Sequence, residues 1–388
     1  MKIGEFSDSF LPVVDGVGRV VYSYCESIAK TGNEVSAIVP LTRMGYRGNY
    51  PFEIIDYYSR ALPGLEQYRM GMPLIDEHFR QHLDMTEFDI VHAHTPFIAG
   101  PEAIHYAKKH HIPLVGTFHS KYYDDFVQIS GSRIIAGIST DVLVAEFFNK
   151  CDEVWALSQR SAETLRSYGY NRDIFIMPNG MDIHTITESQ KERAIQEFGI
   201  HPDVPVLLYV GQMNWKKNIA LILEACASLK QSGQRIQLVL AGQGHHEEEI
   251  KEKTEALGLT DDTVFTGHVK DSELLYGLYA AADLFVFPST YDTFSMVVRE
   301  AANAETASVC VQGSSAAECI EDGVNGLLCH ETSKDLFEVL SHALEDKSHI
   351  KEMGLCARKT IPISWDTITQ RVLERYQYLI DHYQETEA

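Results

Sequence analysis

The chain has 388 residues, of which 45% are hydrophobic and 23% charged, and these are the proportions of a globular protein with room for two domains. Its 33 Lys and Arg against 55 Asp and Glu give a formal net charge of -22. This balance argues against nucleic acid as a partner, because phosphate binding needs clustered cations, and against simple adhesion to anionic lipid. Residues 1–180 hold 16 Lys and Arg and 22 Asp and Glu, so a local basic face in this less acidic half is compatible with the composition.

Seven cysteines are scattered along the chain without a C-x-x-C pair, a pattern that favours reduced thiols in the cytosol. The chain begins Met-Lys-Ile-Gly-Glu, and Glu5 and Asp8 interrupt the apolar run, so we expect no signal peptide. No stretch reaches the roughly 20 apolar residues of a membrane span. We therefore predict a cytoplasmic protein, either free or peripheral on the inner face of the membrane.

The N-terminal half alternates short apolar runs with amphipathic stretches. We expect strands at 2–6, 34–40, 52–57, 89–93, 111–118, 151–157 and 174–177, helices at 19–31, 100–110 and 159–168, and a mostly helical stretch at 122–149. Gly16 and Gly18 lie between the first strand and its helix, where they would let the backbone approach a diphosphate. The G-x-G-x-x-G spacing is absent, because Val21 stands at the third glycine position, and this disfavours a nicotinamide dinucleotide site.

Residues 61–85 predict a loose amphipathic helical region, in which apolar residues are interspersed with Arg69 and Arg80 and preceded by Arg60. Such a helix either packs on its own domain or forms a lip of an acceptor site that contacts lipid or a partner. The sequence leaves both readings open.

Three histidines, His92, His94 and His119, occupy neighbouring strand ends and should converge at one edge of a parallel sheet. We predict no metal there, because His92 and His94 lack zinc-site spacing and no Cys or carboxylate stands nearby to complete a ligand set. A histidine at a strand end is commonly a hydrogen-bonded structural residue. We single out His119, because imidazole can donate to or accept from a hydroxyl group near neutral pH.

The second half repeats the alternation after a polar stretch. We expect strands at 206–210, 237–241, 263–265, 284–287 and 308–311, helices at 219–232, 246–257 and 272–281, and a further helix whose first turn holds 294–297. The predicted domains are 1–185 and 203–360, with a C-terminal helical segment at 361–388 that packs back toward the N-terminal domain. Repeated strand, glycine loop and helix units predict an α/β protein with two Rossmann-like parallel sheets facing each other across a cleft.

The stretch Asp283–Asn303 has the layout of a ligand site. A buried strand leads into a polar loop with Asp292, and a helix with Glu300 follows. Backbone N–H groups at a helix start favour anions, and ligands of open parallel sheets bind at the carboxyl ends of the strands. The same pattern also fits an ordinary unit with surface acids.

These motifs together resemble the retaining, sugar-nucleotide-dependent glycosyltransferases of family 4, which have the two-Rossmann-domain GT-B fold. The motifs are Asp15-Gly16-Val17-Gly18, His92-Ala93-His94-Thr95-Pro96, Thr117-Phe118-His119, Pro178-Asn179-Gly180-Met181-Asp182, Gly211 with Lys217-Asn218, Ala241-Gly242-Gln243-Gly244, the Asp292 and Glu300 pair, and Gly323-Val324-Asn325-Gly326. Their order and spacing match the family along nearly the whole chain. The segments 2–18 and 298–301 look most like bacterial diacylglycerol glucosyltransferases.

The resemblance implies a metal-independent hexosyltransferase that needs no cofactor and moves glucose from UDP-glucose to an acceptor such as diacylglycerol. It implies His119, Asp292 and Lys217 as catalytic residues, with Glu300 on the ribose hydroxyls and Lys217 on the diphosphate. Donor contacts are implied for Gly16, Gly18, Arg19, Gly211, Gln212, Lys217, Gly242, Phe294, Ser295, Met296 and Glu300, and acceptor-side contacts for His94, Thr95 and His119. Fixed cations and helix-end amides can stabilise the departing diphosphate without a metal.

The sequence departs from the family pattern at the donor site. Gln212 stands where the family usually has an arginine on the diphosphate, so one permanent charge is missing. Asp292 is one methylene shorter than the usual glutamate, Ser295 replaces the usual glycine, and 314–315 are serines where two glycines are common. These departures predict an altered donor sugar pocket. They leave open a transferase for a polysaccharide precursor or small soluble acceptor, and a sugar-nucleotide-binding protein without transferase activity.

Overall fold

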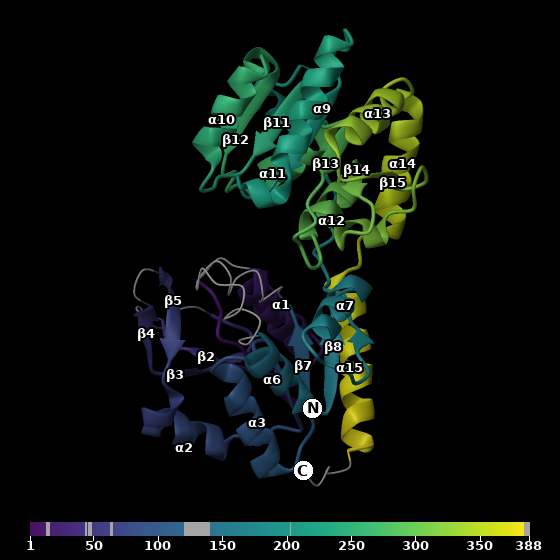
Figure 1. Ribbon diagram of the computed structural model, residues 1–388. Coiled ribbons are helices and arrows are strands. Elements are labelled where there is room, and N and C mark those ends of the chain that lie inside the picture. The colour runs from purple at the N-terminus through teal and green to yellow at the C-terminus, as the bar shows by residue number, and fades with distance from the viewer. Residues whose placement is uncertain are drawn as a thin grey trace. The chain divides into compact units, whose positions relative to one another are not determined.

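In the computed structural model the chain forms two compact units, residues 1–180 with 364–388 and residues 181–363 (Figure 1). The structure describes residues 1–388 except 13–15, 43–44, 46–48, 63–64, 120–139, 202 and 384–388. Asp15 of the expected glycine loop and residues 122–139 of the expected helical stretch lie outside the described residues. Within the described part of the chain, no helix has the length and apolar character needed to cross a membrane.

The first unit is built on a parallel sheet whose strand order is β3-β2-β1-β6-β7-β8-β9. Its strands are β1 (Lys2–Phe6), β2 (Glu34–Pro40), β3 (Glu53–Tyr57), β6 (Ile90–Ala93), β7 (Leu114–Phe118), β8 (Glu153–Ala156) and β9 (Phe175–Ile176). The order reverses between β1 and β6, and the carboxyl ends of strands at such a point form the ligand-binding edge of an open α/β sheet. The expected parallel sheet is confirmed.

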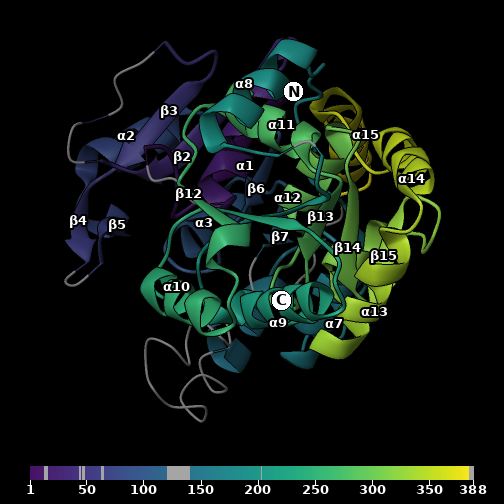
Figure 2. The same ribbon diagram turned by 90° about the horizontal axis from the view of Figure 1, so that it is seen from above.

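Helices cover both faces of this sheet (Figures 1 and 2). They are α1 (Gly16–Lys30) and α15 (Trp365–Asp381) on one face, and α2 (Glu77–Met85), α3 (Ala99–His110), α6 (Glu146–Asn149) and α7 (Gln159–Ser167) on the other. Within the expected helical stretch at 122–149, the described part begins as a π-helical turn at 140–145 and continues as α6. Ser158 caps α7 by accepting the backbone N–H of Ser161.

The expected helical region at 61–85 is wrong for most of its length. Residues 59–62 and 65–71 form the antiparallel strands β4 (Ser59–Leu62) and β5 (Leu65–Gly71), and only α2 is helical beyond a short 3-10 turn at 73–75. Two local signals explain the error. Pro63-Gly64 is a turn-favouring dipeptide between two runs, and Asp76 starts a new helix by accepting the backbone N–H of Phe79 at 3.0 Å.

The second unit has a parallel sheet of strand order β12-β11-β10-β13-β14-β15, which reverses between β10 and β13. Its strands are β10 (Val206–Val210), β11 (Gln237–Ala241), β12 (Thr263–Gly267), β13 (Leu284–Phe287), β14 (Ala307–Val311) and β15 (Gly326–Cys329). Its helices are α9 (Ile219–Gln231), α10 (Glu247–Ala256) and α13 (Ser333–Ala343) on one face, and α8 (Glu188–Phe198), α11 (Ser272–Ala281), α12 (Met296–Asn303) and α14 (Lys347–Thr360) on the other (Figure 2).

Part of the stretch that we expected to separate the domains is the helix α8, which packs against α11 of the second unit. Thr187 and Gln190 form a capping box at its start, and Gly199 ends it in a left-handed conformation. The crossing is close, because a Cβ at Gly277 of α11 would lie 2.2 Å from the carbonyl oxygen of Gln190. Only Ala194 of α8 is fully buried, so the apolar face is too narrow to stand out in the sequence.

The chain passes between the two units at 180–181 and at 363–364. The two passages are joined by a hydrogen bond, in which the backbone N–H of Met181 donates to the carbonyl oxygen of Ile363 at 2.9 Å. Beside it, a Cβ at Gly180 would lie 2.7 Å from the Cα of Trp365. A glycine is therefore required where α15 begins against the first unit.

Candidate functional site

The glycine loops of the second unit meet at the carboxyl ends of β10 and β11. The backbone N–H of Gly211 donates to the carbonyl oxygen of Ala241 at 3.0 Å, and a Cβ at Gly242 would lie only 1.8 Å from the carbonyl oxygen of Gly211. Gly242 also has a φ of 139°, so both sterics and backbone conformation require glycine. Gln212 is exposed beside them, and its carbonyl oxygen accepts the hydroxyl of Tyr209 at 2.9 Å.

Lys217 and Asp292 come from loops that follow β10 and β13, the two strands at the reversal point of the sheet. The Nζ atom of Lys217 lies 2.8 Å from Oδ1 of Asp292, and Ser289 donates to the other carboxylate oxygen at 2.5 Å. The side chains of Lys217 and Asp292 are 13% and 23% exposed. The structure thus brings together the predicted cation and the predicted acid as a hydrogen-bonded ion pair open to a ligand.

The loop before α12 ends in an uncommon backbone conformation. Ser295, the N-cap residue, has a φ of 53°, so α12 begins at Met296 and not at Phe294 as the sequence predicted. The buried guanidinium of Arg299 donates to the carbonyl oxygen of Phe294 at 2.5 Å and lies 3.6 Å from the centre of its ring. Ser295 is buried, and its Oγ atom has no hydrogen-bond partner among the described residues.

Glu300 lies on α12, and one of its carboxylate oxygens accepts the hydroxyl of Tyr279 at 2.9 Å. Burial and the charge of Glu300 hold the pKa of Tyr279 well above its usual value. The phenol therefore stays protonated and orients the carboxylate as a donor partner. Glu318, an acid in the loop that follows β14, lies exposed on the short 3-10 segment Ala316–Cys319.

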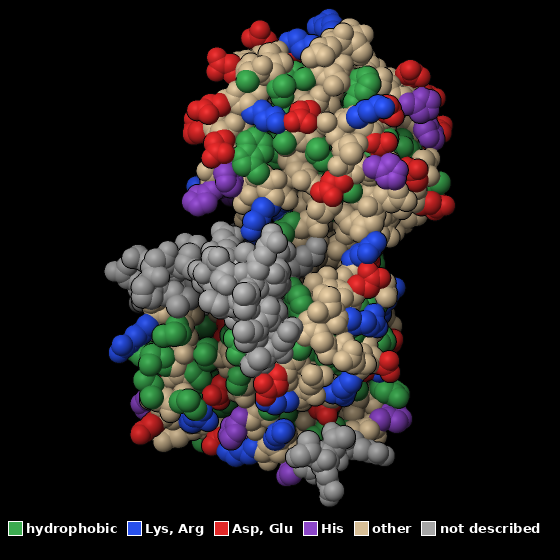
Figure 3. All heavy atoms as spheres, viewed as in Figure 1, with side chains coloured by type: hydrophobic (Ala, Val, Ile, Leu, Met, Phe, Trp, Pro, Cys, Tyr) green, Lys and Arg blue, Asp and Glu red, His purple; other side chains and the backbone are tan. Residues whose placement is uncertain are grey.

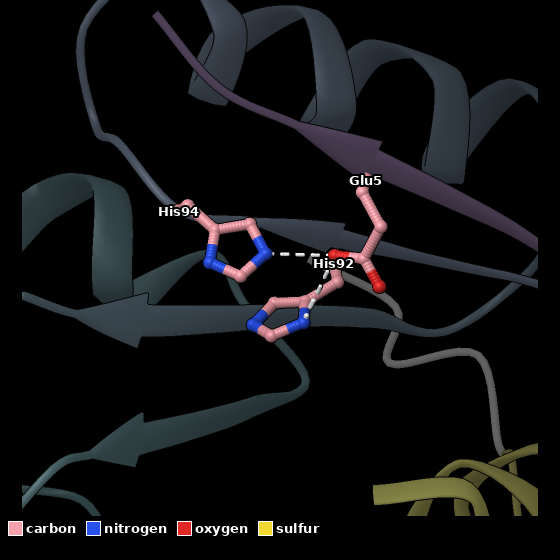
Figure 4. A group of neighbouring side chains, drawn as sticks. All are labelled: Glu5, His92 and His94. Carbon is pink, nitrogen blue, oxygen red and sulfur yellow. Dashed lines mark hydrogen bonds and ion pairs between the residues drawn. The ribbon is translucent and has the colours of Figure 1, made fainter. Parts of the chain in front are cut away.

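In the first unit, His94 and His92 point toward the carboxylate of Glu5, a residue of β1 (Figure 4). Nε2 of His94 lies 2.7 Å from Oε2 of Glu5, and Nδ1 of His94 lies 2.9 Å from Nε2 of His119. Nδ1 of His92 lies 2.5 Å from the hydroxyl of Tyr376 on α15, and Nε2 of His92 lies 2.6 Å from Oγ1 of Thr117. The expected convergence of the three histidines is therefore observed.

Burial decides the charge of this cluster. Burial alone would raise the pKa of Glu5, but the charges and hydrogen bonds of His92 and His94 lower it to about 2. Burial lowers the pKa of His92 to about 4 and that of His119 well below its usual value. At neutral pH the cluster therefore contains a carboxylate anion beside neutral His92 and His119.

Our statement that no carboxylate lies near His92 and His94 is wrong, because strand pairing places Glu5 of β1 next to them. The ligand atoms of Glu5, His92 and His94 lie within 4.8 Å of one another, which is close enough for a shared cation. All four ring nitrogens of the two histidines already have partners within hydrogen-bond distance in the protein. We therefore interpret the cluster as a buried hydrogen-bond network.

The remaining predicted residues of the first unit lie at the same edge of the sheet. Thr95 donates its hydroxyl to Asp8 at 2.7 Å and accepts the backbone N–H of Asp8 at 2.8 Å. Gly16 is the first residue of α1 and is exposed, Gly18 is buried, and Arg19 is exposed. Thr95 is thus tied to the loop after β1, while Gly16 and Arg19 present their atoms to solvent.

Two family models match consecutive parts of the chain. Residues 14–185 match the model described as Glycosyltransferase Family 4, and residues 190–360 match the model described as Glycosyl transferases group 1.

The chain is a glycosyltransferase with a Family 4 domain followed by a group 1 domain.

Curated relatives of this glycosyltransferase differ in the donors and acceptors that their names state. It is 26% identical over 97% of its length to the alpha-monoglucosyldiacylglycerol synthase of Streptococcus pneumoniae, of which 85% is covered. It is 27% identical over 98% of its length to the GDP-mannose-dependent alpha-mannosyltransferase of Corynebacterium glutamicum, of which 89% is covered.

Solved structures share the fold of this glycosyltransferase. Anabaena HepE in complex with UDP is 19% identical and superposes with a TM-score of 0.77, covering 98% of this chain and 100% of that one. The sucrose-phosphate synthase of Thermosynechococcus elongatus is 18% identical, with a TM-score of 0.78 and coverage of 98% and 99%. The predicted fold class of two Rossmann-like α/β domains, as in GT-B enzymes, is confirmed.

Sequence reasoning missed four residues of this glycosyltransferase that contact predicted site residues or their loops, namely Glu5, Tyr279, Arg299 and Tyr376. Glu5 had a readable signal, since a charged residue inside an otherwise buried strand needs a partner. Tyr279, Arg299 and Tyr376 look like ordinary amphipathic helix positions in the sequence. Their partners are set by helix packing, which the sequence pattern does not specify.

Proposed function

We propose that this glycosyltransferase transfers glucose from UDP-glucose to a diacylglycerol-type lipid acceptor with retention of the anomeric configuration. The observation that carries the donor half of this proposal is the grouping of Lys217, Asp292 and the start of α12 in the second unit. These groups follow the carboxyl ends of β10 and β13, where open α/β sheets bind ligands. The proposal needs neither a cofactor nor a metal.

Each group has a role that its chemistry suits. The ammonium group of Lys217 neutralises the diphosphate. In the free enzyme Asp292 holds this group in place, with Nζ of Lys217 2.8 Å from Oδ1 of Asp292. Asp292 then turns one oxygen to a sugar hydroxyl while Ser289 retains the other. Backbone N–H groups at Phe294–Met296 bind phosphate or sugar oxygens, and Glu300, oriented by Tyr279, accepts the ribose hydroxyls.

In the reaction the acceptor hydroxyl oxygen forms a bond to the anomeric carbon as the bond from that carbon to the phosphate oxygen breaks. Attack occurs on the face that the diphosphate leaves, and the departing phosphate takes the acceptor proton, so that UDP and the glycoside are the products. The leaving diphosphate gains negative charge in the transition state. Lys217 and the amides before α12 stabilise that charge, each preorganised donor contributing about 3 to 4 kcal/mol by analogy with oxyanion holes.

The choice of UDP and glucose follows two similar proteins. The pneumococcal relative is named for glucosyl transfer to diacylglycerol, and HepE has been solved with UDP-glucose. GDP-mannose, the donor named for the corynebacterial relative, is the competing donor. The shortened Asp292 and the serine at 295 alter the pocket around the sugar, so donor choice is the part of the proposal that an experiment must decide first.

A lipid acceptor is supported by an exposed apolar surface on the first unit. Hydrophobic side chains gather around β4 in Figure 3, and Met70, Leu74 and Ile75 are 45%, 79% and 63% exposed on β5 and the 3-10 turn after it. Arg60 is paired across the strands with Met70 and so shares its face. Apolar side chains beside an arginine suit the interface of an anionic membrane. We therefore propose that the enzyme works at the inner face of the membrane. Its overall negative charge opposes this binding, so the apolar contacts must outweigh that repulsion.

A donor panel tests the proposal. UDP-glucose, UDP-galactose, GDP-mannose and free UDP are compared by thermal shift, since a ligand at 100 times its dissociation constant stabilises the folded protein by about 2.7 kcal/mol. We expect UDP-glucose and UDP to raise the unfolding temperature and GDP-mannose to have no effect. Stabilisation by GDP-mannose alone contradicts the proposed donor. UDP-glucose that binds without hydrolysis or transfer to any acceptor favours a binding protein.

Flotation with vesicles tests the acceptor side. We expect the protein to float with vesicles that contain anionic lipid, and the Leu74→Ser/Ile75→Ser variant to float less. Leu355→Ser removes an exposed leucine from the second unit and serves as the matched control, which should float like the unaltered protein. A protein that stays at the bottom of the gradient with every vesicle favours a small soluble acceptor or a polysaccharide precursor.

A further inference from the structure

We propose that Glu5 and His94 are positioning residues that fix the tautomer of His119, so that His119 carries its ring proton on Nε2 and its lone pair on Nδ1. A hydroxyl of the substrate would then donate to Nδ1 of His119. The assignment of a substrate contact to His119 rests on the proposed function. The tautomer itself is a property of the folded chain and can be measured without any substrate.

The donor and acceptor roles along Glu5, His94 and His119 follow from the charge of Glu5. An ionised carboxylate can only accept hydrogen bonds, so Nε2 of His94, 2.7 Å from Oε2 of Glu5, must carry a proton. In the proposed arrangement His94 carries a single ring proton, so its lone pair is on Nδ1. That atom lies 2.9 Å from Nε2 of His119, so His119 must be the donor in this bond. The lone pair of a neutral His119 is consequently on Nδ1.

The second oxygen of Glu5 is held as well, which prevents the carboxylate from turning away. The hydroxyl of Tyr376 donates to Oε1 of Glu5 at 3.1 Å. Because the hydroxyl proton of Tyr376 is used in the hydrogen bond to Glu5, the oxygen of Tyr376 accepts from Nδ1 of His92, and Thr117 donates to Nε2 of His92. Every donor in this set therefore has an acceptor, and His92 adopts the Nδ1–H form beside the chain.

The ionisable side chains packed around Glu5 carry no negative charge of their own. Tyr24 and Cys25 of α1 and Tyr376 of α15 lie near Glu5, and burial together with the charge of Glu5 raises the pKa of all three. These side chains remain neutral at pH 7 while Glu5 is ionised. Glu5 is therefore the anion among the described groups that face His92 and His94, and its field favours proton donation from His94 and, through it, from His119.

The tautomer decides whether His119 accepts or donates a hydrogen bond. An imidazole with its lone pair on Nδ1 accepts a hydrogen bond from a substrate hydroxyl, whereas the other tautomer would have to donate to that hydroxyl. Donation of Nε2–H of His119 to Nδ1 of His94 also makes Nδ1 of His119 a better acceptor. A fixed tautomer removes the need to select one of two forms when the sugar binds.

The test combines nitrogen NMR of 15N-histidine-labelled full-length protein with kinetics on UDP-glucose and dioleoylglycerol vesicles. The His119 signals are assigned from their loss in His119→Asn. We expect wild-type His119 to show a protonated Nε2 and an unprotonated Nδ1 at pH 7.5. A protonated Nδ1 in the wild-type protein would falsify the proposal, and this arm needs no folded variant of Glu5.

Glu5→Gln removes the acceptor-only anion, and Tyr376→Phe is the matched control, which removes one bond to Glu5 but leaves the path to His119 intact. We expect Glu5→Gln to shift His119 toward the Nδ1–H form and to lower kcat/KM by about 10- to 100-fold, in the range seen when a partner that orients a ligand is lost. The dissociation constant of free UDP for Glu5→Gln should stay within about 3-fold of the wild-type value. An unchanged His119 tautomer in Glu5→Gln, or an equal shift in Tyr376→Phe, overturns the proposal. A wild-type protein with the expected tautomer but no transfer to any acceptor contradicts the proposed function and leaves the chain from Glu5 to His119 supported.

Discussion

Lowering the pH from 7.5 to 5 should destabilise the first unit through its buried histidines. The folded pKa of His92 is about 4, whereas an unfolded histidine titrates near 6.5. A depressed folded pKa means that the unfolded chain binds the proton first, so the stabilisation is complete above pH 6.5 and is lost as the pH falls toward 4. At pH 5 the loss from His92 alone is about 2 kcal/mol, and His119 acts in the same direction.

Carboxyl groups of the same unit modify this loss only at lower pH or oppose it. The pKa of Glu5 is about 2, so its stabilisation is present above the unfolded value and is lost only as the pH falls below about 4.5. Burial raises the pKa of Asp8, Asp56 and Asp152. These carboxyl groups bind protons more readily in the folded protein than in the unfolded one. Acidification therefore stabilises the fold through them and offsets part of the stability lost through the histidines.

Tryptophan fluorescence can report on the first unit separately. Trp155 and Trp365 lie in the first unit and Trp215 in the second, so in a Trp215→Phe variant both remaining tryptophans report on the first unit. Urea unfolding at pH 7.5 and 5 should show a loss of about 2 kcal/mol. The matched variant His92→Asn cannot titrate and should lose correspondingly less. A loss below about 0.5 kcal/mol, or the same loss in His92→Asn, would refute this reasoning.

Four further predictions concern the second unit. Lys217→Met should lower kcat/KM for UDP-glucose by about 100- to 1,000-fold, because it removes a fixed cation from the leaving diphosphate; steady-state kinetics showing less than about a 5-fold change would contradict this. Tyr279→Phe should weaken UDP binding by about 5- to 10-fold in calorimetry, since Glu300 loses an orienting hydrogen bond of about 1 kcal/mol, and unaltered affinity would count against that role. Ser295→Gly should unfold at a higher temperature than Ser295→Ala, because alanine keeps the left-handed backbone strain of about 1 kcal/mol; equal unfolding temperatures would remove the strain argument. Gly242→Ala should abolish UDP binding or folding, because its Cβ would overlap the carbonyl oxygen of Gly211, and a variant with normal affinity and circular dichroism would show that the two loops can separate.

The strands and glycine loops of the second unit were predictable because each element is signalled locally. The apolar runs at β10, β11 and β13 are followed by glycines or a proline, and parallel packing then places their carboxyl ends together. Lys217 and Asp292 are 75 residues apart in sequence, yet both follow strands at the reversal point of the sheet. The resemblance to family 4 supplied their roles, and the geometry supplies their contact.

The errors arise where the outcome depends on packing between distant segments. Residues 65–71 carry apolar side chains at spacings that fit a helix, but pairing with β4 makes them a strand. The cap of α12 is Ser295, and Arg299 stabilises this start by donating to the carbonyl oxygens of Phe294 and Ser295. Glu5 was overlooked because its partners, His94 directly after β6 and Tyr376 on α15, are 89 and 371 residues away in sequence. Local periodicity contains no information about such partners.

The product formed from UDP-glucose and dioleoylglycerol vesicles shows whether the enzyme transfers glucose to a lipid with retention of configuration. The lipid product is extracted, identified by mass spectrometry and examined by proton NMR for the configuration at its anomeric carbon. We expect a monoglucosyl lipid with the same α configuration as the donor, formed without added divalent metal and lost in Lys217→Met. A β-linked product, or a product formed from GDP-mannose and not from UDP-glucose, would contradict it.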